Sequence, residues 1–190
     1  MKRWIDLMLA VPLAIAAVPV VLLVAIAVRI ETPGSPIFLQ RRVGRNGRIF
    51  PLVKLRTMYA NTRHVASHEV PHAAITRVGV VIRRLKIDEL PQLANVILGQ
   101  MSLVGPRPCL PTQVELIDER QALGVDRLLP GITGISQVQG LDMSDPARLA
   151  ASDAAYIKGW SVTADLAILW ATVAGHGFGD AAMARLRDPD

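Results

Sequence analysis

The N-terminal part of the chain is a long run of apolar residues. From Leu7 to Val28 there is no charged or strongly polar side chain over 22 residues. A straight helix over this stretch would be about 33 Å long, and the hydrocarbon core of a bilayer is about 30 Å thick. The pattern therefore predicts a membrane helix over residues 1–30, followed by one polar domain over residues 31–190.

A proline near the middle of the apolar segment allows two different paths of the helix through the membrane. Pro19 would free the carbonyl of Ile15 and cost about 3 kcal/mol in a soluble helix, and in lipid the freed group needs another partner. Lys2 and Arg3 precede the segment and Arg29 follows it. Basic residues prefer the cytoplasmic side, which fits a helix that bends at Pro19 and returns to the same face. A kinked single span fits as well.

The polar domain alternates between short extended pieces and helices. Apolar alternation predicts strands, apolar residues at helical spacing predict helices, and turn residues separate the two. The fold class expected is therefore α+β, with short strands and with helices resting on the core or at the membrane interface. The expected extended pieces are residues 37–40 and 49–55, the expected helices are 115–123, 146–160 and 164–174, and 61–74 is expected to be a surface loop.

A further helix is predicted to begin at an acidic pair. Asp88 is a suitable N-cap, Pro91 fits the first turn, and Gly99 fits the end of the helix. The apolar stripe predicted for this helix consists of Leu90, Leu93, Ala94 and Ile97.

Charge and composition narrow the class of partner. The formal net charge is +5, which suits an anionic membrane surface and phosphorylated substrates. Aromatic residues make up only 4% of the chain and no zinc-ligand spacing occurs, so nucleic acid is not expected as a partner. A single cysteine excludes an internal disulfide.

The acidic pair Asp88-Glu89 is the strongest candidate for chemistry. It follows the basic residues Arg83, Arg84 and Lys86. At the start of a helix both carboxylates can reach one cleft, where an aspartate can attack phosphorus or hold a metal and a glutamate can bind the same metal or move a proton. The simpler alternative is that the pair only caps a helix.

Three arginines are candidates for binding phosphate. Guanidinium groups bind phosphate in a bidentate manner and keep their charge. Arg107 is framed by Pro106 and Pro108, which fixes the backbone that presents it, and Arg83 lies just before the acidic pair. Arg42 belongs to a basic cluster that could contact lipid headgroups. Arg42 itself could instead belong to the phosphate site.

Several motifs together resemble a known family. The chain resembles the bacterial sugar transferases, or monotopic phosphoglycosyl transferases, in their minimal catalytic form. The resemblance is densest from Thr76 to Pro108 and includes the acidic pair and the Gly-Pro-Arg-Pro motif. It also includes Ile37–Gly44, Lys54–Met58, Pro130–Gly134, Gln137-Val138 and Asp153–Tyr156.

This resemblance implies an activity and a set of roles. Such enzymes transfer a phospho-sugar from a nucleoside diphosphate sugar, usually UDP-linked, to polyprenyl phosphate and release UMP, with Mg²⁺ as cofactor. By resemblance Asp88 is the nucleophile, Glu89 assists at the metal or in proton transfer, and Arg83 and Arg107 bind phosphate. The family also implies a re-entrant helix broken near Pro19 and a catalytic domain on the cytoplasmic face of the bacterial inner membrane.

The chain departs from the family pattern at a few positions. Val18 stands where many members have serine before the break proline, Leu141 follows Gly140 where arginine is common, and Gln100 replaces a common aspartate. None of these changes touches the acidic pair. The resulting prediction is a phosphoglycosyl transferase that acts at the first membrane step of exopolysaccharide or glycoconjugate synthesis. The alternatives are direct transfer without a covalent step, and a non-catalytic membrane adaptor with a basic partner-binding face.

Overall fold

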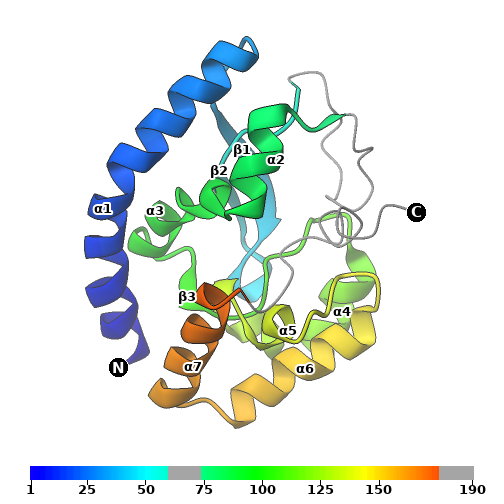
Figure 1. Ribbon diagram of the computed structural model, residues 1–190. Helices are drawn as coiled ribbons and strands as arrows, with labels where there is room; N and C mark the ends of the chain where they lie inside the picture. Colours follow the sequence, from blue (N-terminus) through cyan, green and yellow to red (C-terminus); the bar gives the residue numbers. More distant parts are fainter. Residues whose placement is uncertain (60–73, 176–190) are drawn as a thin grey trace.

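The computed structural model describes residues 1–59 and 74–175, so the loop expected over 61–74 lies almost wholly outside the described residues. In the described part, helices surround two small sheets (Figure 1), which confirms the mixed helix and strand class. The helices of four or more residues are α1 (Lys2–Glu31), α2 (Arg77–Arg84), α3 (Gln92–Ile97), α4 (Val114–Ala122), α5 (Ile135–Val138), α6 (Pro146–Lys158) and α7 (Val162–Val173). The strands are β1 (Ile37–Val43), β2 (Ile49–Leu55), β3 (Ser102–Val104) and β4 (Gly131–Thr133), and the 3₁₀ helices are η1 (Arg45–Gly47), η4 (Ile87–Glu89) and η5 (Val125–Arg127).

Helix α1 contains the whole predicted apolar segment. It is 30 residues long and apolar enough to cross a membrane. Pro12 and Pro19 both lie inside it, and the helix continues through them along one side of the molecule (Figure 1). A break or reversal at Pro19 is therefore not shown, and re-entrant insertion stays a prediction.

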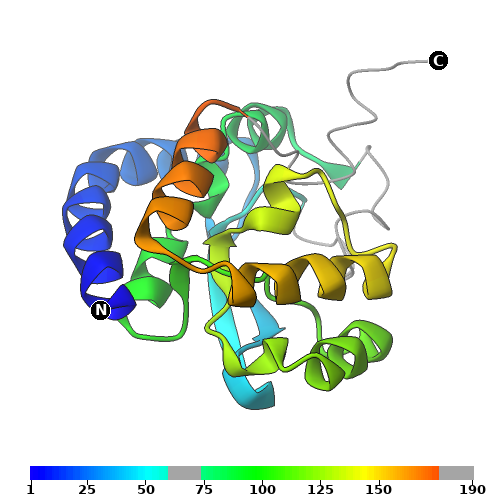
Figure 2. The same cartoon turned by 90° about the horizontal axis from the view of Figure 1, so that it is seen from below.

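The N-terminal end of α1 is bonded to the rest of the fold through polar side chains. Arg3 donates to the carbonyls of Val96 and Ile97 at the C-terminal end of α3, at 2.6 and 3.0 Å. Lys2 forms an ion pair of 2.6 Å with Asp165 on α7, and α7 lies beside this end of α1 (Figure 2). The helix is therefore part of the folded domain as well as a candidate membrane element.

Asp6 forms the most deeply buried of these links. Its side chain is 4% exposed and accepts hydrogen bonds from the Ser102 hydroxyl at 2.8 Å and the Leu103 amide at 3.1 Å. We expect Asp6→Ala to lower the free energy of unfolding by about 2–4 kcal/mol, because two buried donors lose their acceptor at about 1–3 kcal/mol each. Asp6→Asn, which keeps one acceptor oxygen, should lose less.

Thermal unfolding of the purified protein in detergent measures both effects. The control is Asp118→Ala, which removes an exposed carboxylate on α4 and should leave the midpoint nearly unchanged. Equal midpoints for Asp6→Ala and the control would contradict the role assigned to Asp6.

The first sheet is the antiparallel hairpin of β1 and β2, which pairs Ile37 with Leu55 and Val43 with Ile49. The strand predicted over residues 49–55 is confirmed with the same bounds. The expected extended piece 37–40 is the first part of a longer strand that runs to Val43, and the turn is confined to residues 44–48. The hairpin places Lys54, near the end of β2, beside η4.

The second sheet is a parallel pair of three-residue strands, β3 and β4, with Ser102 opposite Gly131 and Val104 opposite Thr133. The Gly-Pro-Arg-Pro segment leaves β3 in contact with the loop around β4. A Cβ atom on Gly131 would lie 2.1 Å from the Gly105 nitrogen, and one on Gly134 would lie 2.3 Å from the Gly105 oxygen. Glycine is therefore required for this close backbone approach, which fixes where Arg107 emerges.

The helix expected to begin at Asp88 differs in the structure. Asp88 does not cap it, since Asp88 and Glu89 lie in the separate 3₁₀ helix η4 and α3 begins at Gln92 after Pro91. Leu93 of the predicted stripe is buried, whereas Ala94 and Ile97 are exposed and Val96 enters the core instead. The cause is that α3 buries its Leu93 and Val96 side against the core, so part of the apolar stripe faces outward.

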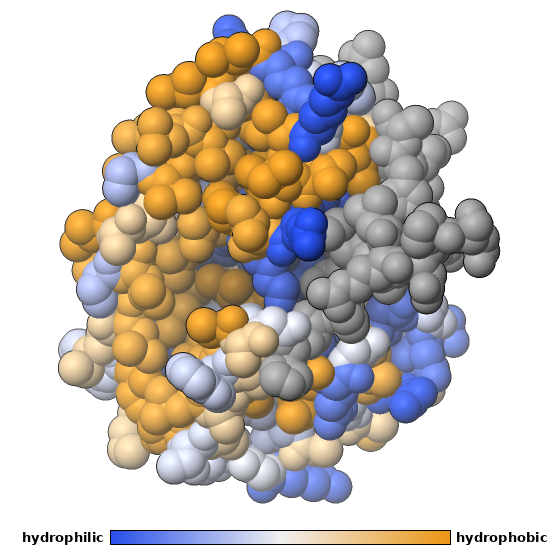
Figure 3. Space-filling model, viewed as in Figure 1, coloured by the Kyte–Doolittle hydropathy of each residue, from blue (hydrophilic) through white to orange (hydrophobic). Residues whose placement is uncertain are grey.

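A broad apolar surface surrounds α1. Figure 3 shows hydrophobic residues from α1 across the neighbouring part of this face, with a recess in the middle. Such a large exposed patch is typical of a membrane or protein contact rather than of a surface in water. Outside α1, the large exposed apolar side chains of the described residues include Val81 of α2, Leu85 just after α2, Leu98 after α3, and Leu166, Trp170 and Val173 of α7.

Candidate active site

A left-handed residue separates the basic helix α2 from the acidic pair. Helix α2 is capped at its N-terminus by the Thr76 side chain and ends at Arg84, and Lys86 has a φ of 56°. The left-handed region is uncommon for a residue other than glycine. This reversal brings Ile87–Glu89 back as a single 3₁₀ turn, so the acidic pair follows a bend in the chain and does not extend α2.

Glu89 is the centre of a partly buried charge cluster formed by three parts of the chain. One of its carboxylate oxygens lies 3.2 Å from the Lys54 ammonium and 3.2 Å from the Arg107 guanidinium. The Glu89 side chain is 15% exposed, with Lys54 at 12% and Arg107 at 19%. Strand β2, η4 and the loop after β3 therefore meet at one carboxylate.

The two cations keep Glu89 ionised. Burial alone would raise the pKa of the carboxyl, but the charges and hydrogen bonds of Lys54 and Arg107 outweigh it and lower the pKa from 4.5 to about 2. Glu89 is thus a carboxylate at any physiological pH. It can orient a guanidinium or hold a cation, and it is too weak a base to remove a proton efficiently near neutral pH.

This lowered pKa predicts an acid-dependent loss of stability. Because the folded-state pKa is lower, Glu89 stabilises the fold fully above about pH 4.5, and the contribution is lost as the pH falls towards 2. Glu89→Gln should lower the free energy of unfolding at pH 7 by on the order of 3 kcal/mol. The difference between wild type and variant should shrink steadily below pH 4.5.

Unfolding midpoints in detergent between pH 3 and 7 measure this difference. Glu115→Gln, at an exposed position of α4, is the matched control. A wild-type advantage over Glu89→Gln that stays constant down to pH 3 would show that the ion pairs do not hold the carboxylate ionised.

The other predicted site residues have different surroundings. Asp88 is buried at 7% exposure, next to Glu89 in η4. Arg83 donates from Nε to the Thr57 hydroxyl at 2.7 Å, and its buried Nη1 atom has no hydrogen-bond partner among the described residues. A buried guanidinium nitrogen without a partner is suited to an anionic ligand.

Arg42 is placed differently from the other arginines. It is 7% exposed, donates twice to the side-chain oxygen of Gln40, and donates to the Pro108 carbonyl at 3.0 Å. It therefore supports the Gly-Pro-Arg-Pro loop from the hairpin. Its predicted role as a phosphate ligand stays a prediction.

A cavity of about 260 Å³ opens beside the charge cluster. Lys86, Glu89 and Arg107 form its charged end, with Thr133, Gln137 and Thr172 as further polar groups. The remaining wall is apolar and includes Leu13 of α1 and Leu169 and Val173 of α7. The cavity thus combines two cations and a carboxylate with walls from the elements of the apolar face. Asp88, Arg83 and Arg42 are not among the residues that line it.

Comparison with known proteins identifies the family of this chain. The family model described as "Bacterial sugar transferase" matches residues 1–177. The chain belongs to the bacterial sugar transferase family. This match covers α1, the acidic pair, the Gly-Pro-Arg-Pro loop and the cavity, which confirms the resemblance drawn from the motifs.

Similar proteins in the family have informative names. The chain is 39% identical over 185 residues to the undecaprenyl-phosphate glucose phosphotransferase of Komagataeibacter xylinus, with 90% of this chain and 35% of that protein covered. It is 37% identical over 189 residues to the exopolysaccharide production protein ExoY of Sinorhizobium fredii, at 90% and 83% coverage. It is 38% identical over 181 residues to the UDP-glucose:undecaprenyl-phosphate glucose-1-phosphate transferase of Caulobacter vibrioides, at 90% and 68% coverage. The chain thus spans about a third of the first relative and most of the second.

Sequence reasoning alone assigned no role to Lys54 or Lys86. Lys54 begins Lys54–Met58, one of the segments that resemble the family, and lies near the end of a predicted strand. This position was the only sequence feature that pointed to a role for Lys54. Its contact with Glu89 joins residues 35 positions apart, so no local pattern could predict it.

Proposed function

We propose that this protein transfers a phospho-sugar from a nucleoside diphosphate sugar, most readily a UDP-sugar, to polyprenyl phosphate at a membrane. The observation that supports this most is the cavity whose charged end joins Glu89, Arg107 and Lys86 and whose walls are apolar. A diphosphate needs nearby cations while its phosphorus is attacked, and a lipid substrate needs an apolar path to the same point. Relatives whose names include UDP-glucose and undecaprenyl phosphate support the same substrate classes.

The proposed reaction has two displacements at one phosphorus atom. A carboxylate oxygen of Asp88 attacks the sugar-bearing phosphorus, and the bond to the bridging oxygen breaks to release UMP. A phosphate oxygen of the polyprenyl phosphate then attacks the same phosphorus, which breaks the bond to Asp88 and yields polyprenyl diphosphate sugar. Arg107 and Arg83 would hold phosphate oxygens, and Glu89 would orient Arg107 through their ion pair.

The proposed cofactor is a magnesium ion, which Asp88 and Glu89 would hold. Mg²⁺ in phosphate sites is usually held by one or two carboxylates together with substrate phosphates and waters. Asp88 and Glu89 supply two adjacent carboxyl groups, and Glu89 is ionised. No group of three or more His, Cys, Asp or Glu residues suitable for a metal occurs in the described part of the chain. When bound, Mg²⁺ would neutralise charge on the diphosphate.

The size of the cavity suggests how the substrates divide the space. Pockets that enclose a whole drug-sized ligand are typically about 300–1,000 Å³, and this cavity is about 260 Å³. Only part of a nucleotide sugar would therefore lie inside, with the remainder over the loops around it. The apolar wall formed by Leu13, Leu169 and Val173 would receive the first lipid units.

The proposed setting is the cytoplasmic face of the bacterial inner membrane. The exposed apolar face and basic residues at both ends of α1 support a helix that dips into the bilayer and returns, with Pro19 as the bend. In this setting the cavity would lie at the level of the lipid phosphates. This level is where a polyprenyl phosphate presents its head group.

A screen of UDP-sugars for UMP release tests the proposal. The full chain in detergent is incubated with Mg²⁺ and each sugar nucleotide, with and without polyprenyl phosphate. We expect UMP with at least one sugar, accompanied by a polyprenyl diphosphate product. Relatives are named for glucose, galactose and N-acetylgalactosamine, so these are the first sugars to test. No turnover with any nucleotide sugar would instead favour a non-catalytic membrane adaptor.

A further inference from the structure

We infer that Arg120, held by Asp153, is a positioning residue that fixes the main chain of Arg107 at the charged end of the cavity. This inference rests on the proposed function, and it assigns to α4 and α6 a role in the reaction. Neither residue lines the cavity beside Glu89. Their effect on the site is therefore transmitted through the loop that presents Arg107.

The contacts of Arg120 show how it is held. The residue is 7% exposed and Asp153 is 2% exposed. Arg120 donates from Nε and Nη2 to one Asp153 oxygen at 3.1 and 2.7 Å, and the Ser136 hydroxyl donates to the other oxygen at 2.7 Å. A buried guanidinium fixed at both of these nitrogens has little rotational freedom.

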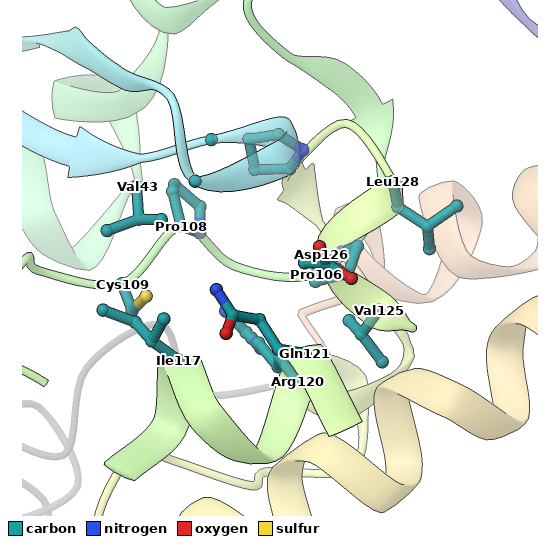
Figure 4. A pocket seen from close by; sticks show the side chains of 13 residues that line it. Val43, Pro106, Pro108, Cys109, Ile117, Arg120, Gln121, Val125, Asp126 and Leu128 are labelled. Carbon is teal, nitrogen blue, oxygen red and sulfur yellow. The ribbon is translucent and has the colours of Figure 1, made fainter. Parts of the chain in front are cut away.

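The remaining nitrogen of Arg120 reaches the active-site loop. Its Nη1 atom donates to the Arg107 carbonyl at 2.8 Å. Figure 4 shows Arg120 rising from α4 towards the loop that contains Pro106 and Pro108, at the edge of a small second cavity of about 40 Å³. Arg107 is thus bonded at both ends: Arg120 bonds its main-chain carbonyl, and Glu89 pairs with its guanidinium.

The other supports of the loop hold the residues on either side of Arg107, and Arg120 bonds Arg107 itself. Pro106 and Pro108 restrict the neighbouring φ angles, and the amide of Gly105 is bonded to the Thr133 carbonyl at 2.8 Å. Arg42 holds the Pro108 carbonyl from the hairpin. The Arg107 carbonyl is the point between these supports, and Arg120 is the side chain that bonds it. Catalysis is sensitive to displacement, with an error of about 1 Å costing up to about 100-fold.

The test is a double-mutant cycle in the full chain. Arg120→Lys keeps the charge but cannot bond Asp153 twice and the Arg107 carbonyl at once. We expect it to lower kcat for UMP release by about 10- to 100-fold, with a smaller change in KM for the UDP-sugar. In an Arg107→Ala background the same change should alter kcat by less than about twofold, because the group it positions is absent. An equal loss in both backgrounds would overturn the inference.

A second measurement is independent of turnover. Amide hydrogen exchange of the segment 105–109 should be faster in Arg120→Lys than in wild type. The matched control is Arg56→Lys, which alters a similarly buried arginine that bonds Thr32 and Pro33 at the end of α1. This control should leave exchange in that segment unchanged. If exchange in Arg120→Lys equals that of wild type, the inference is overturned, whether or not the protein turns over a sugar nucleotide. Absence of turnover by the wild type would count against the proposed function alone.

A second variant guards against misfolding of Arg120→Lys. Asp153→Asn keeps the shape of the side chain and weakens its hold on Arg120 by removing the charge. We expect a smaller loss of kcat than for Arg120→Lys, again abolished in the Arg107→Ala background, together with faster exchange over 105–109. A loss that persists without Arg107 would show a general structural role.

Discussion

Asp88→Asn should abolish UMP release from the UDP-sugar that the protein accepts. The amide has nearly the shape of the carboxylate but cannot act as the nucleophile, so we expect a loss of about 10⁴-fold or more. The fold should persist, since the change at this residue, 7% exposed, removes a charge without changing volume. UMP detection in detergent with Mg²⁺, together with an unfolding curve for each variant, measures both statements.

Asp118→Asn is the matched control for this substitution. It makes the same chemical change at an exposed position of α4 and should leave the rate within about twofold. Asp88→Asn with wild-type turnover would remove Asp88 from the chemistry and leave Glu89 as the only acidic residue of the pair in the site.

Arg107→Ala should lower kcat by about 10²- to 10³-fold. The residue lines the cavity and forms an ion pair with Glu89, and in the proposed reaction its guanidinium binds the phosphate on which charge develops. Removing one donor aimed at developing charge typically costs this much. Arg107→Lys should recover only part of the rate, because an ammonium cannot reproduce bidentate phosphate binding. Steady-state kinetics of UMP release measures both variants.

Arg127→Ala is the control for the loss of one positive charge. Arg127 is exposed on η5 and should be replaceable with little effect on kcat. If Arg107→Ala and Arg127→Ala lower the rate equally, the effect comes from the overall charge of the protein and not from a contact with substrate.

Local patterns predicted much of the fold. The strand expected over 49–55 has the same bounds in the structure, and the helices expected over 115–123, 146–160 and 164–174 agree with α4, α6 and α7 to within two residues at every end. Strand β4 was not among the predicted extended pieces. It has only three residues between Pro130 and Gly134, and its pairing with β3 depends on residues about thirty positions away. A strand this short has no periodicity of its own.

The acidic pair shows where local reasoning failed. The residue types predicted an N-cap, whereas Lys86 in the left-handed region and Pro91 after the pair divide the segment into η4 and α3. The candidate chemistry was nevertheless predictable, because Glu89 and Arg107 were both named from charge and proline framing. The contacts that assemble the site join residues 13 to 35 positions apart. They are those of Glu89 with Lys54 and Arg107, and that of Arg120 with the Arg107 carbonyl. Such contacts follow from tertiary packing.

The central claim is that phosphorus passes through a covalent bond to Asp88. The most direct measurement is mass spectrometry of the peptide that contains Asp88, after incubation with a UDP-sugar and Mg²⁺ in the absence of polyprenyl phosphate. The account predicts a gain equal to one sugar phosphate on Asp88, formed together with UMP and removed when polyprenyl phosphate is added. UMP that forms only when the lipid is present, with no modified Asp88 at any time, would contradict it and establish direct transfer.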